Sequence, residues 1–272
     1  MAPSNALMLV LLIACILVIS VNLLMLLTFA INRSVLHTMS PLVASLAFAD
    51  LMVGLSMVLT FFVPGPGTGM FAILAVIGSL MHLLVIAIDR CVSVLIPMTY
   101  QAKMTTRKTV VIIVLLWITV LGIVACPMLA ARSVRATPPQ ALQLSLFLLT
   151  SALLVGLYSY LGAVALRHHR KIRRQVGSLD QEQYPGIPKA TRVLIAVLGV
   201  YIVLWAPYFT SLLLVLTGRT DLMSQRLDFI GILLVDINSG VNFFIYGFMN
   251  ESFRSAVIHT LKCKKARNLD MN

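Results

Sequence analysis

The sequence of 272 residues is poor in charged side chains: Asp, Glu, Lys and Arg make up 11% of it, whereas 60% of its residues are hydrophobic. A soluble domain carries about 25% charged residues, so this composition excludes a soluble fold. Acidic residues are especially scarce, with 9 Asp and Glu against 21 Lys and Arg. The net charge of +12 does not indicate nucleic-acid binding, because the basic residues lie between apolar runs rather than along one polar face.

Seven apolar runs divide the chain, at about 6–31, 39–63, 68–96, 107–131, 140–166, 189–217 and 225–248. A helix of about 20 apolar residues crosses a bilayer and satisfies its own backbone hydrogen bonds there. We therefore predict an all-α membrane protein, a seven-transmembrane helix bundle that forms a single domain over 1–265. An amphipathic stretch at about 250–262 predicts a short eighth helix on the membrane surface, followed by a tail at 266–272. The first run is too long for the core of a cleavable signal peptide and is expected to remain as a span.

Basic residues lie mainly on one side of the predicted membrane. Of the 21 Lys and Arg residues, 17 fall on the side that holds Arg90 and the C-terminus, and the other 4 fall on the opposite side. Cytoplasmic segments of membrane proteins carry the excess of Lys and Arg. We therefore expect a multi-pass protein of the plasma membrane, with the N-terminus outside and the C-terminus in the cytoplasm.

The four cysteines are not positioned for a disulfide on the outer side. Cys15 and Cys126 lie within spans, Cys91 lies at the inner end of the third span, and Cys263 lies in the tail. Cys263 follows the predicted surface helix and has lysine neighbours, so it is a candidate for palmitoylation. The alternative is an exposed thiol without a function.

Three acidic residues lie at membrane depth, where a charge is costly and marks a functional site by default: Asp50, Asp89 and Asp236. Because no Lys or Arg lies at mid-membrane, Asp50 must bind hydroxyls, amides, water or a cation. Alternatively, Asp50 is a neutral carboxyl that only joins helices. His82, the only histidine within a span, is expected to be a hydrogen-bonded packing residue. The polar candidates around Asp50 are Asn22, Ser79, Asn238, Ser239 and Asn242.

Four short motifs lie within or at the ends of these apolar runs. They are LAFAD ending at Asp50, DRC beginning at Asp89, LWAPY ending at Tyr208, and NSGVNFFIY ending at Tyr246. These stretches resemble the LAxxD, DRY, CWxPY and NSxxNPxxY motifs of rhodopsin-like (class A) G-protein-coupled receptors. Further matches to the same family are Asn22, Pro97, Tyr100, Trp117 and Phe253-Arg254. The resemblance covers about 20–265 and depends on the order of the motifs along the chain.

This resemblance implies roles for individual residues. A sodium ion would bind at Asp50, Ser79, Asn238, Ser239 and Asn242. The activation switch would comprise Asp89, Arg90, Tyr160, Trp205, Pro207 and Tyr246. Arg90 and Met98 would contact a heterotrimeric G protein, and the basic run 167–174 would either join that contact or bind anionic lipid. Tyr160 and Tyr246 would meet through water in the active state, although lipid-facing or core packing is the alternative for Trp205 and the tyrosines.

Several positions depart from the family pattern. Cys91 replaces the motif tyrosine, Phe243 replaces the seventh-helix proline and should straighten that helix, and Ile187 replaces the acid that would pair with Arg90. Gly65 and Ala152 stand where the family has a third-helix cysteine and a fifth-helix proline. The missing cysteine and the missing fifth-helix proline recur together in the melanocortin, lysophospholipid and cannabinoid receptor group, to which adenosine receptors are related.

The ligand is constrained mainly by what the spans lack. Without a Lys in the seventh span no retinal can bind, and Ala72 stands where amine receptors have an aspartate. The charged residues of melanocortin and sphingolipid receptors are replaced by Gly65, Thr68 and Gly69. The pocket is therefore expected to be apolar and to suit a lipid-like ligand or a small cationic amphiphile, with Asp236 as its one charge. Alternatively, Asp236 forms an internal hydrogen bond. The pocket candidates are Ala72, Trp205, Tyr208, Leu212 and Asp236.

Rival classes have less support in the sequence. A transporter would show repeated halves with broken helices, and an intramembrane enzyme would show a catalytic constellation, neither of which is found. We therefore expect a receptor without enzymatic activity and without cofactors other than sodium. A receptor-like protein that has lost signalling, or that signals without ligand, stays possible because Cys91, Ile187 and Phe243 alter the switch.

Overall fold

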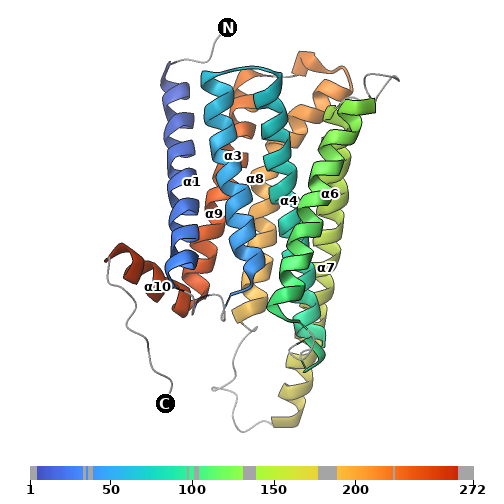
Figure 1. Ribbon diagram of the computed structural model, residues 1–272. Coiled ribbons are helices and arrows are strands. Elements are labelled where there is room, and N and C mark those ends of the chain that lie inside the picture. The colour runs from blue at the N-terminus through green and yellow to red at the C-terminus, as the bar shows by residue number, and fades with distance from the viewer. Residues whose placement is uncertain are drawn as a thin grey trace.

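The structure is a computed structural model that describes residues 5–32, 35, 39–96, 98–100, 104–130, 139–176, 189–222 and 224–262. Within these ranges, seven helices are long and apolar enough to cross a membrane, and they run side by side as a bundle (Figure 1). The predicted seven-helix bundle is therefore confirmed. The long helices are α1 (Asn5–Ile31), α3 (Pro41–Phe62), α4 (Pro66–Leu95), α6 (Thr106–Ala130), α7 (Pro139–Val176), α8 (Lys189–Leu216) and α9 (Gln225–Met249).

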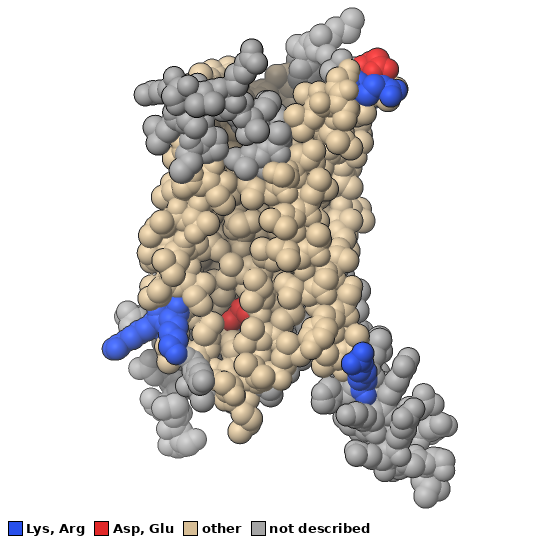
Figure 2. Space-filling model, turned by 90° about the vertical axis from the view of Figure 1, so that its right-hand side faces the viewer, with Lys and Arg blue, Asp and Glu red and all other residues tan. Residues whose placement is uncertain are grey.

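Two short elements complete the described chain. The 3₁₀ turn η2 (Thr220–Leu222) joins α8 to α9, and α10 (Glu251–Leu261) lies across one end of the bundle (Figure 1). We call that end the Arg90 end and the opposite end, where α1 begins, the Asn5 end. Figure 2 shows basic side chains toward both ends of one face, with an almost uniformly uncharged surface between them, as lipid contact requires.

The helix ends follow from local chemistry. Pro41 and Pro66 lie in the first turns of α3 and α4, where a missing N–H costs no helical hydrogen bond. The Ser40 hydroxyl caps α3 by accepting from the Leu42 amide at 3.4 Å, and the Asn250 side chain caps α10 by accepting from the Phe253 amide at 3.2 Å. The main departure from the predicted bounds is α7, which continues past about 166 to Val176.

The surface helix α10 is fixed to the bundle by packing. Phe253 is fully buried and contacts the rings of Phe29 and Phe243, at centroid distances of 6.1 and 5.9 Å. Asn32 at the end of α1 donates to the Thr260 hydroxyl at 2.9 Å. Phe243, which replaces the family's proline, lies within the uninterrupted helix α9. Its contact with Phe253 helps to fix α10 to the bundle.

Candidate functional site

Asp50 lies in the centre of the bundle and joins three helices. Its carboxylate is fully buried. Ser79 of α4 donates to one oxygen at 2.7 Å, and Asn242 of α9 donates to the other at 2.8 Å. The sequence-predicted partners Ser79 and Asn242 are thus brought together around Asp50.

Asn22 and Asn238, two other predicted members of this group, form no hydrogen bond with Asp50. Ser239 lies close enough to Asp50 to interact with it, although its hydroxyl does not reach hydrogen-bond geometry. Asn22 instead donates to the backbone oxygens of Val18 and Ser239, both at 3.0 Å. The Asn22 side-chain oxygen, the Ser239 hydroxyl and the Asn238 amide nitrogen are buried without a hydrogen-bond partner among the described residues.

Unused oxygens beside a buried carboxylate fit the preference of a hard cation for oxygen ligands. Ser79, Ser239 and Asn22 offer neutral oxygens, and Asp50 offers the compensating charge. The donor set therefore suits sodium chemically, and the unpartnered atoms leave ligands available for it.

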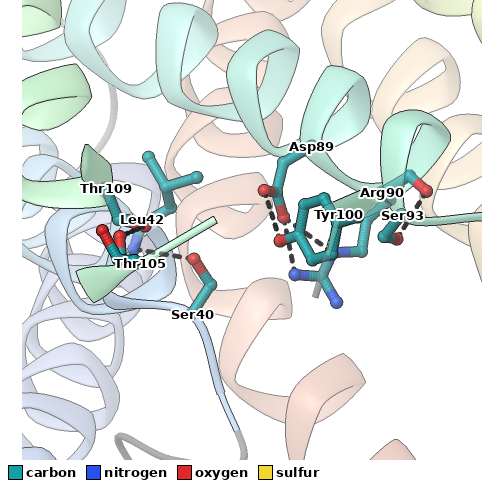
Figure 3. Close-up of polar contacts among 8 residues, drawn as sticks. All are labelled: Ser40, Leu42, Asp89, Arg90, Ser93, Tyr100, Thr105 and Thr109. Atoms are coloured by element: carbon teal, nitrogen blue, oxygen red, sulfur yellow. Dashed lines mark hydrogen bonds and ion pairs between the residues drawn. The ribbon is translucent and has the colours of Figure 1, made fainter. Parts of the chain in front are cut away.

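Arg90 and its neighbours form a second polar cluster near the end of α4, and Figure 3 shows its contacts. The Arg90 guanidinium binds one Asp89 oxygen at 2.6 and 3.1 Å, and the Tyr100 hydroxyl donates to the other at 2.7 Å. Partial burial, together with the hydrogen bond to the Asp89 carboxylate, raises the pKa of Tyr100 to about 12. The Arg90 side chain keeps 43% of its surface exposed, so it can still contact a partner.

The other residues predicted for the G-protein contact and the activation switch differ in their exposure. Met98 is 81% exposed, as an apolar contact with a partner protein requires. Tyr160 is 55% exposed on the surface of α7, which is the lipid-facing alternative in this conformation. Ile187, Cys263 and the side chain of Tyr246 lie outside the described residues.

Trp205 of α8 lies in a cluster of aromatic rings and is almost fully buried. Phe209 stacks on it at a centroid distance of 5.5 Å, and Phe147 of α7 stacks on both. Tyr201 adds a link between the two helices, because its hydroxyl lies 3.2 Å from the Ser151 hydroxyl. Trp205 is therefore a packed core residue here, and its indole N–H has no partner among the described residues.

Pro207 lies inside α8 at a close approach to α9. A Cβ atom added at Gly231 of α9 would lie 2.8 Å from the Cα of Tyr208 and 3.3 Å from the carbonyl carbon of Pro207. Only glycine allows the two backbones to meet in this way. Of the remaining pocket candidates, Leu212 is buried, whereas Ala72 and Tyr208 are half-buried.

Asp236 of α9 is fully buried, and neither of its carboxylate oxygens has a hydrogen-bond partner among the described residues. The Cys15 thiol of α1 lies close enough to interact with it electrostatically, but a thiol is a weak donor. The alternative of an internal hydrogen bond to a neighbouring helix is therefore met only by this weak contact with α1. Its chain neighbour Val235 belongs to the same apolar cluster as Trp205 and Leu212, whereas Asp236 itself faces Cys15 of α1.

The structure also shows a polar network that the sequence did not predict. The Trp117 indole donates to the Ser45 hydroxyl at 3.1 Å, and this hydroxyl lies 2.7 Å from Nε2 of His82. His82 Nδ1 lies 2.7 Å from the Gly78 carbonyl oxygen. The predicted packing role of His82 is confirmed. Ser45 was missed because a serine in an apolar run gives no signal of its own.

Comparison with known proteins agrees with this arrangement. Residues 21–246 match the family model described as 7 transmembrane receptor (rhodopsin family). The "G-protein coupled receptor 3" of Mus musculus is 29% identical over 236 residues, which are 79% of this chain and 70% of that protein. The "Lysophosphatidic acid receptor 1" of Ovis aries is 26% identical over 279 residues (93% and 70%). The "Melanocortin receptor 5" of Homo sapiens is 28% identical over 197 residues (71% and 59%).

Proposed function

Because this chain belongs to the rhodopsin family of seven-transmembrane receptors, we propose that it transmits the binding of a small, lipid-like ligand to a heterotrimeric G protein. Membership of this family implies a receptor rather than an enzyme. The proposal includes a plasma-membrane location with the Asn5 end outside, which rests on the excess of Lys and Arg at the other end.

The apolar pocket candidates support a lipid-like ligand. Trp205 and Leu212 are buried among aliphatic and aromatic side chains, and this cluster includes Val235, the residue that precedes the buried Asp236 in α9. One relative is named a lysophosphatidic acid receptor; for this chain we propose only the broader class, a small molecule with an extended apolar body. The observation that carries the proposal is the apolar cluster that includes the motif residue Trp205 together with Leu212 and Val235.

The Arg90 end supplies the surface for the G protein. Arg90 keeps part of its guanidinium exposed while it pairs with Asp89, and Met98 offers an apolar tip. Movement of α8 about the Pro207 interruption would open a cavity beside Arg90, because a proline removes a helical hydrogen bond and weakens the helix there. The ligand then acts by favouring the open population over the closed one.

Sodium at Asp50 is the proposed inhibitor of this change. The ion would bind the oxygens that α3, α4 and α9 bring together in the closed arrangement. A ligand that favours the open state would weaken sodium binding, and sodium would weaken ligand binding by the same factor.

The test is G-protein dissociation in cells that express the chain, measured with each G-protein class at rest and after addition of lipid-like ligands. Arg90→Ala at matched surface expression is the control, and it should abolish the signal. A wild-type signal no higher than that of Arg90→Ala, for every class and ligand, would favour a receptor-like protein that has lost signalling.

The basic run at the end of α7 needs a separate experiment. The helix carries it beyond the predicted span to Val176 (Figure 1). Arg170, Lys171, Arg173 and Arg174 are replaced by Gln while Arg90 is kept. Reduced coupling with unchanged binding to anionic vesicles would assign the run to the G protein, and the reverse result would assign it to lipid.

A further inference from the structure

Asp236 is the least compensated polar group among the described residues. It is fully buried, and among the described residues its oxygens have no hydrogen-bond partner other than a weak contact with the Cys15 thiol. The three ion pairs found among the described residues are Arg90–Asp89, Arg219–Asp221 and Arg254–Glu251, so none of them includes Asp236. A buried, unpaired carboxylate costs several kcal/mol, and a membrane interior offers no bulk water to offset this cost.

The groups around Asp236 do not supply the missing charge. The Cys15 thiol interacts with it from α1, and Asp50 acts on it electrostatically with charge of the same sign. Asn238, two residues further along α9, has its own amide nitrogen unpartnered among the described residues. The carboxylate therefore has only a weak thiol donor beside it and no cation among the described residues.

The surroundings define what kind of cation would fit. Val235, the residue before Asp236 in α9, packs in the apolar cluster that contains Trp205 and Leu212, and the Cys15 side chain that Asp236 faces is buried as well. A molecule bound at Asp236 would therefore place its remaining atoms among apolar side chains. An ammonium group carries three N–H donors and can serve both carboxylate oxygens at once. We propose that Asp236 is the anchor for the ammonium head of an amphiphilic amine, that is, a molecule with one protonated amine and an extended apolar chain.

This inference rests on the proposed receptor function and narrows its ligand class. On binding, the ammonium N–H groups donate hydrogen bonds to the two Asp236 oxygens instead of to water. The apolar chain of the amine contacts protein instead of lipid. The competing outcome is a carboxyl that stays protonated and only fills space between α1 and α9.

The experiment uses the full chain in nanodiscs of zwitterionic phospholipid, with hexadecylamine as the probe and hexadecanol as its uncharged counterpart. The variants are Asp236→Asn and Asp236→Ala. The matched control is Asp228→Asn, an acid in the first turn of the same helix. Because a change at Asp236 removes only the weak contact with the Cys15 thiol, both variants are expected to fold. Thermal unfolding and the infrared band of a protonated carboxyl are recorded together.

At saturating amine, wild type and Asp228→Asn should unfold about 5 °C higher than with hexadecanol. Both Asp236 variants should lose this shift. Any protonated-carboxyl band that depends on Asp236 should vanish when the amine binds. Equal stabilisation of Asp236→Asn, or a band that persists at saturating amine, would overturn the inference. Basal G-protein turnover in the same nanodiscs separates the two claims: turnover without an Asp236-dependent amine effect removes only the anchor, whereas no turnover with any lipid removes the receptor function itself.

Discussion

The hydroxyl of Tyr100 donates a 2.7 Å hydrogen bond to one carboxylate oxygen of Asp89, while Arg90 occupies the other oxygen. Asp89 therefore holds two groups: the arginine that follows it in α4, and a tyrosine from the segment after that helix. This arrangement leaves no Asp89 oxygen without a partner. It ties the segment around Met98 to the arginine that we expect to contact the G protein.

We predict that Tyr100→Phe destabilises the protein by about 1 kcal/mol. A hydrogen bond to a charged group contributes about 1.5–3 kcal/mol, and the half-buried position of Tyr100 reduces that value. For a protein of this size, the loss lowers the unfolding temperature by about 2–4 °C. The measurement is thermal unfolding of wild type and variant in nanodiscs.

The same pair makes a prediction about pH. The pKa of Tyr100 is raised to about 12 in the folded protein, above about 10 in the unfolded chain. The stabilisation is therefore fully present below about pH 10 and is lost as the pH rises toward 12. The stability difference between wild type and Tyr100→Phe should be constant from about pH 6 to 9. A difference that shrinks within that interval would contradict the assignment.

Much of the fold could be predicted from the sequence because each span is a long apolar run whose length is set by the bilayer. The exception is the end of α7. The polar residues after about 166 mark where the apolar run ends, but Arg, Lys and Gln are good helix formers. The helix therefore continues to Val176. Hydropathy locates the membrane boundary, and it does not locate the end of the helix.

The site could be predicted only where residue type was sufficient. Asp50 needed hydrogen-bond donors, and Ser79 and Asn242 provide them. That the Ser239 hydroxyl is left unpartnered depends on the rotation of α9, which the sequence does not determine. The lack of a partner for Asp236 likewise depends on which residues the neighbouring helices bring near it, and here that polar neighbour is the Cys15 thiol.

We predict strong coupling between Ser45 and His82. Nδ1 of His82 donates to the Gly78 carbonyl, so Nε2 of a neutral ring must accept from the Ser45 hydroxyl, which in turn accepts from Trp117. Ser45→Ala leaves the buried His82 ring nitrogen and the half-buried Trp117 indole without their partner, and an unpaired buried group costs about 1–3 kcal/mol. His82→Phe removes one of these groups, so the double variant should be more stable than the sum of the single changes predicts, by about 0.5–3 kcal/mol. Additive unfolding energies would show that the contacts do not act as a network.

We predict that sodium stabilises the wild type and not Asp50→Asn. At a sodium concentration tenfold above Kd, binding contributes about 1.4 kcal/mol, or about 3–5 °C in the unfolding temperature. N-methylglucamine replaces sodium in the reference buffer. Ser239→Ala is the sharper variant, because its hydroxyl lies close to Asp50 without reaching hydrogen-bond geometry. It should change the sodium-free stability less than Asp50→Asn does and weaken the sodium response. The same response in wild type and Asp50→Asn would exclude this site.

The last prediction concerns the contact between α8 and α9. In Gly231→Ala, the new methyl group would lie 2.8 Å from the Cα and 2.9 Å from the backbone nitrogen of Tyr208. Backbone atoms cannot move aside as a flexible side chain can, so the two helices must separate beside Pro207. Overpacking of this kind costs about 1–3 kcal/mol. The matched control is Gly247→Ala in the same helix, where an added Cβ meets nothing within 4 Å. It should be neutral or stabilising by up to about 1 kcal/mol, because alanine favours the helix. The unfolding temperature of Gly231→Ala should therefore fall, while that of Gly247→Ala should rise or stay unchanged. If both variants unfold at the wild-type temperature, the close approach of α8 and α9 at Gly231 does not exist in the membrane.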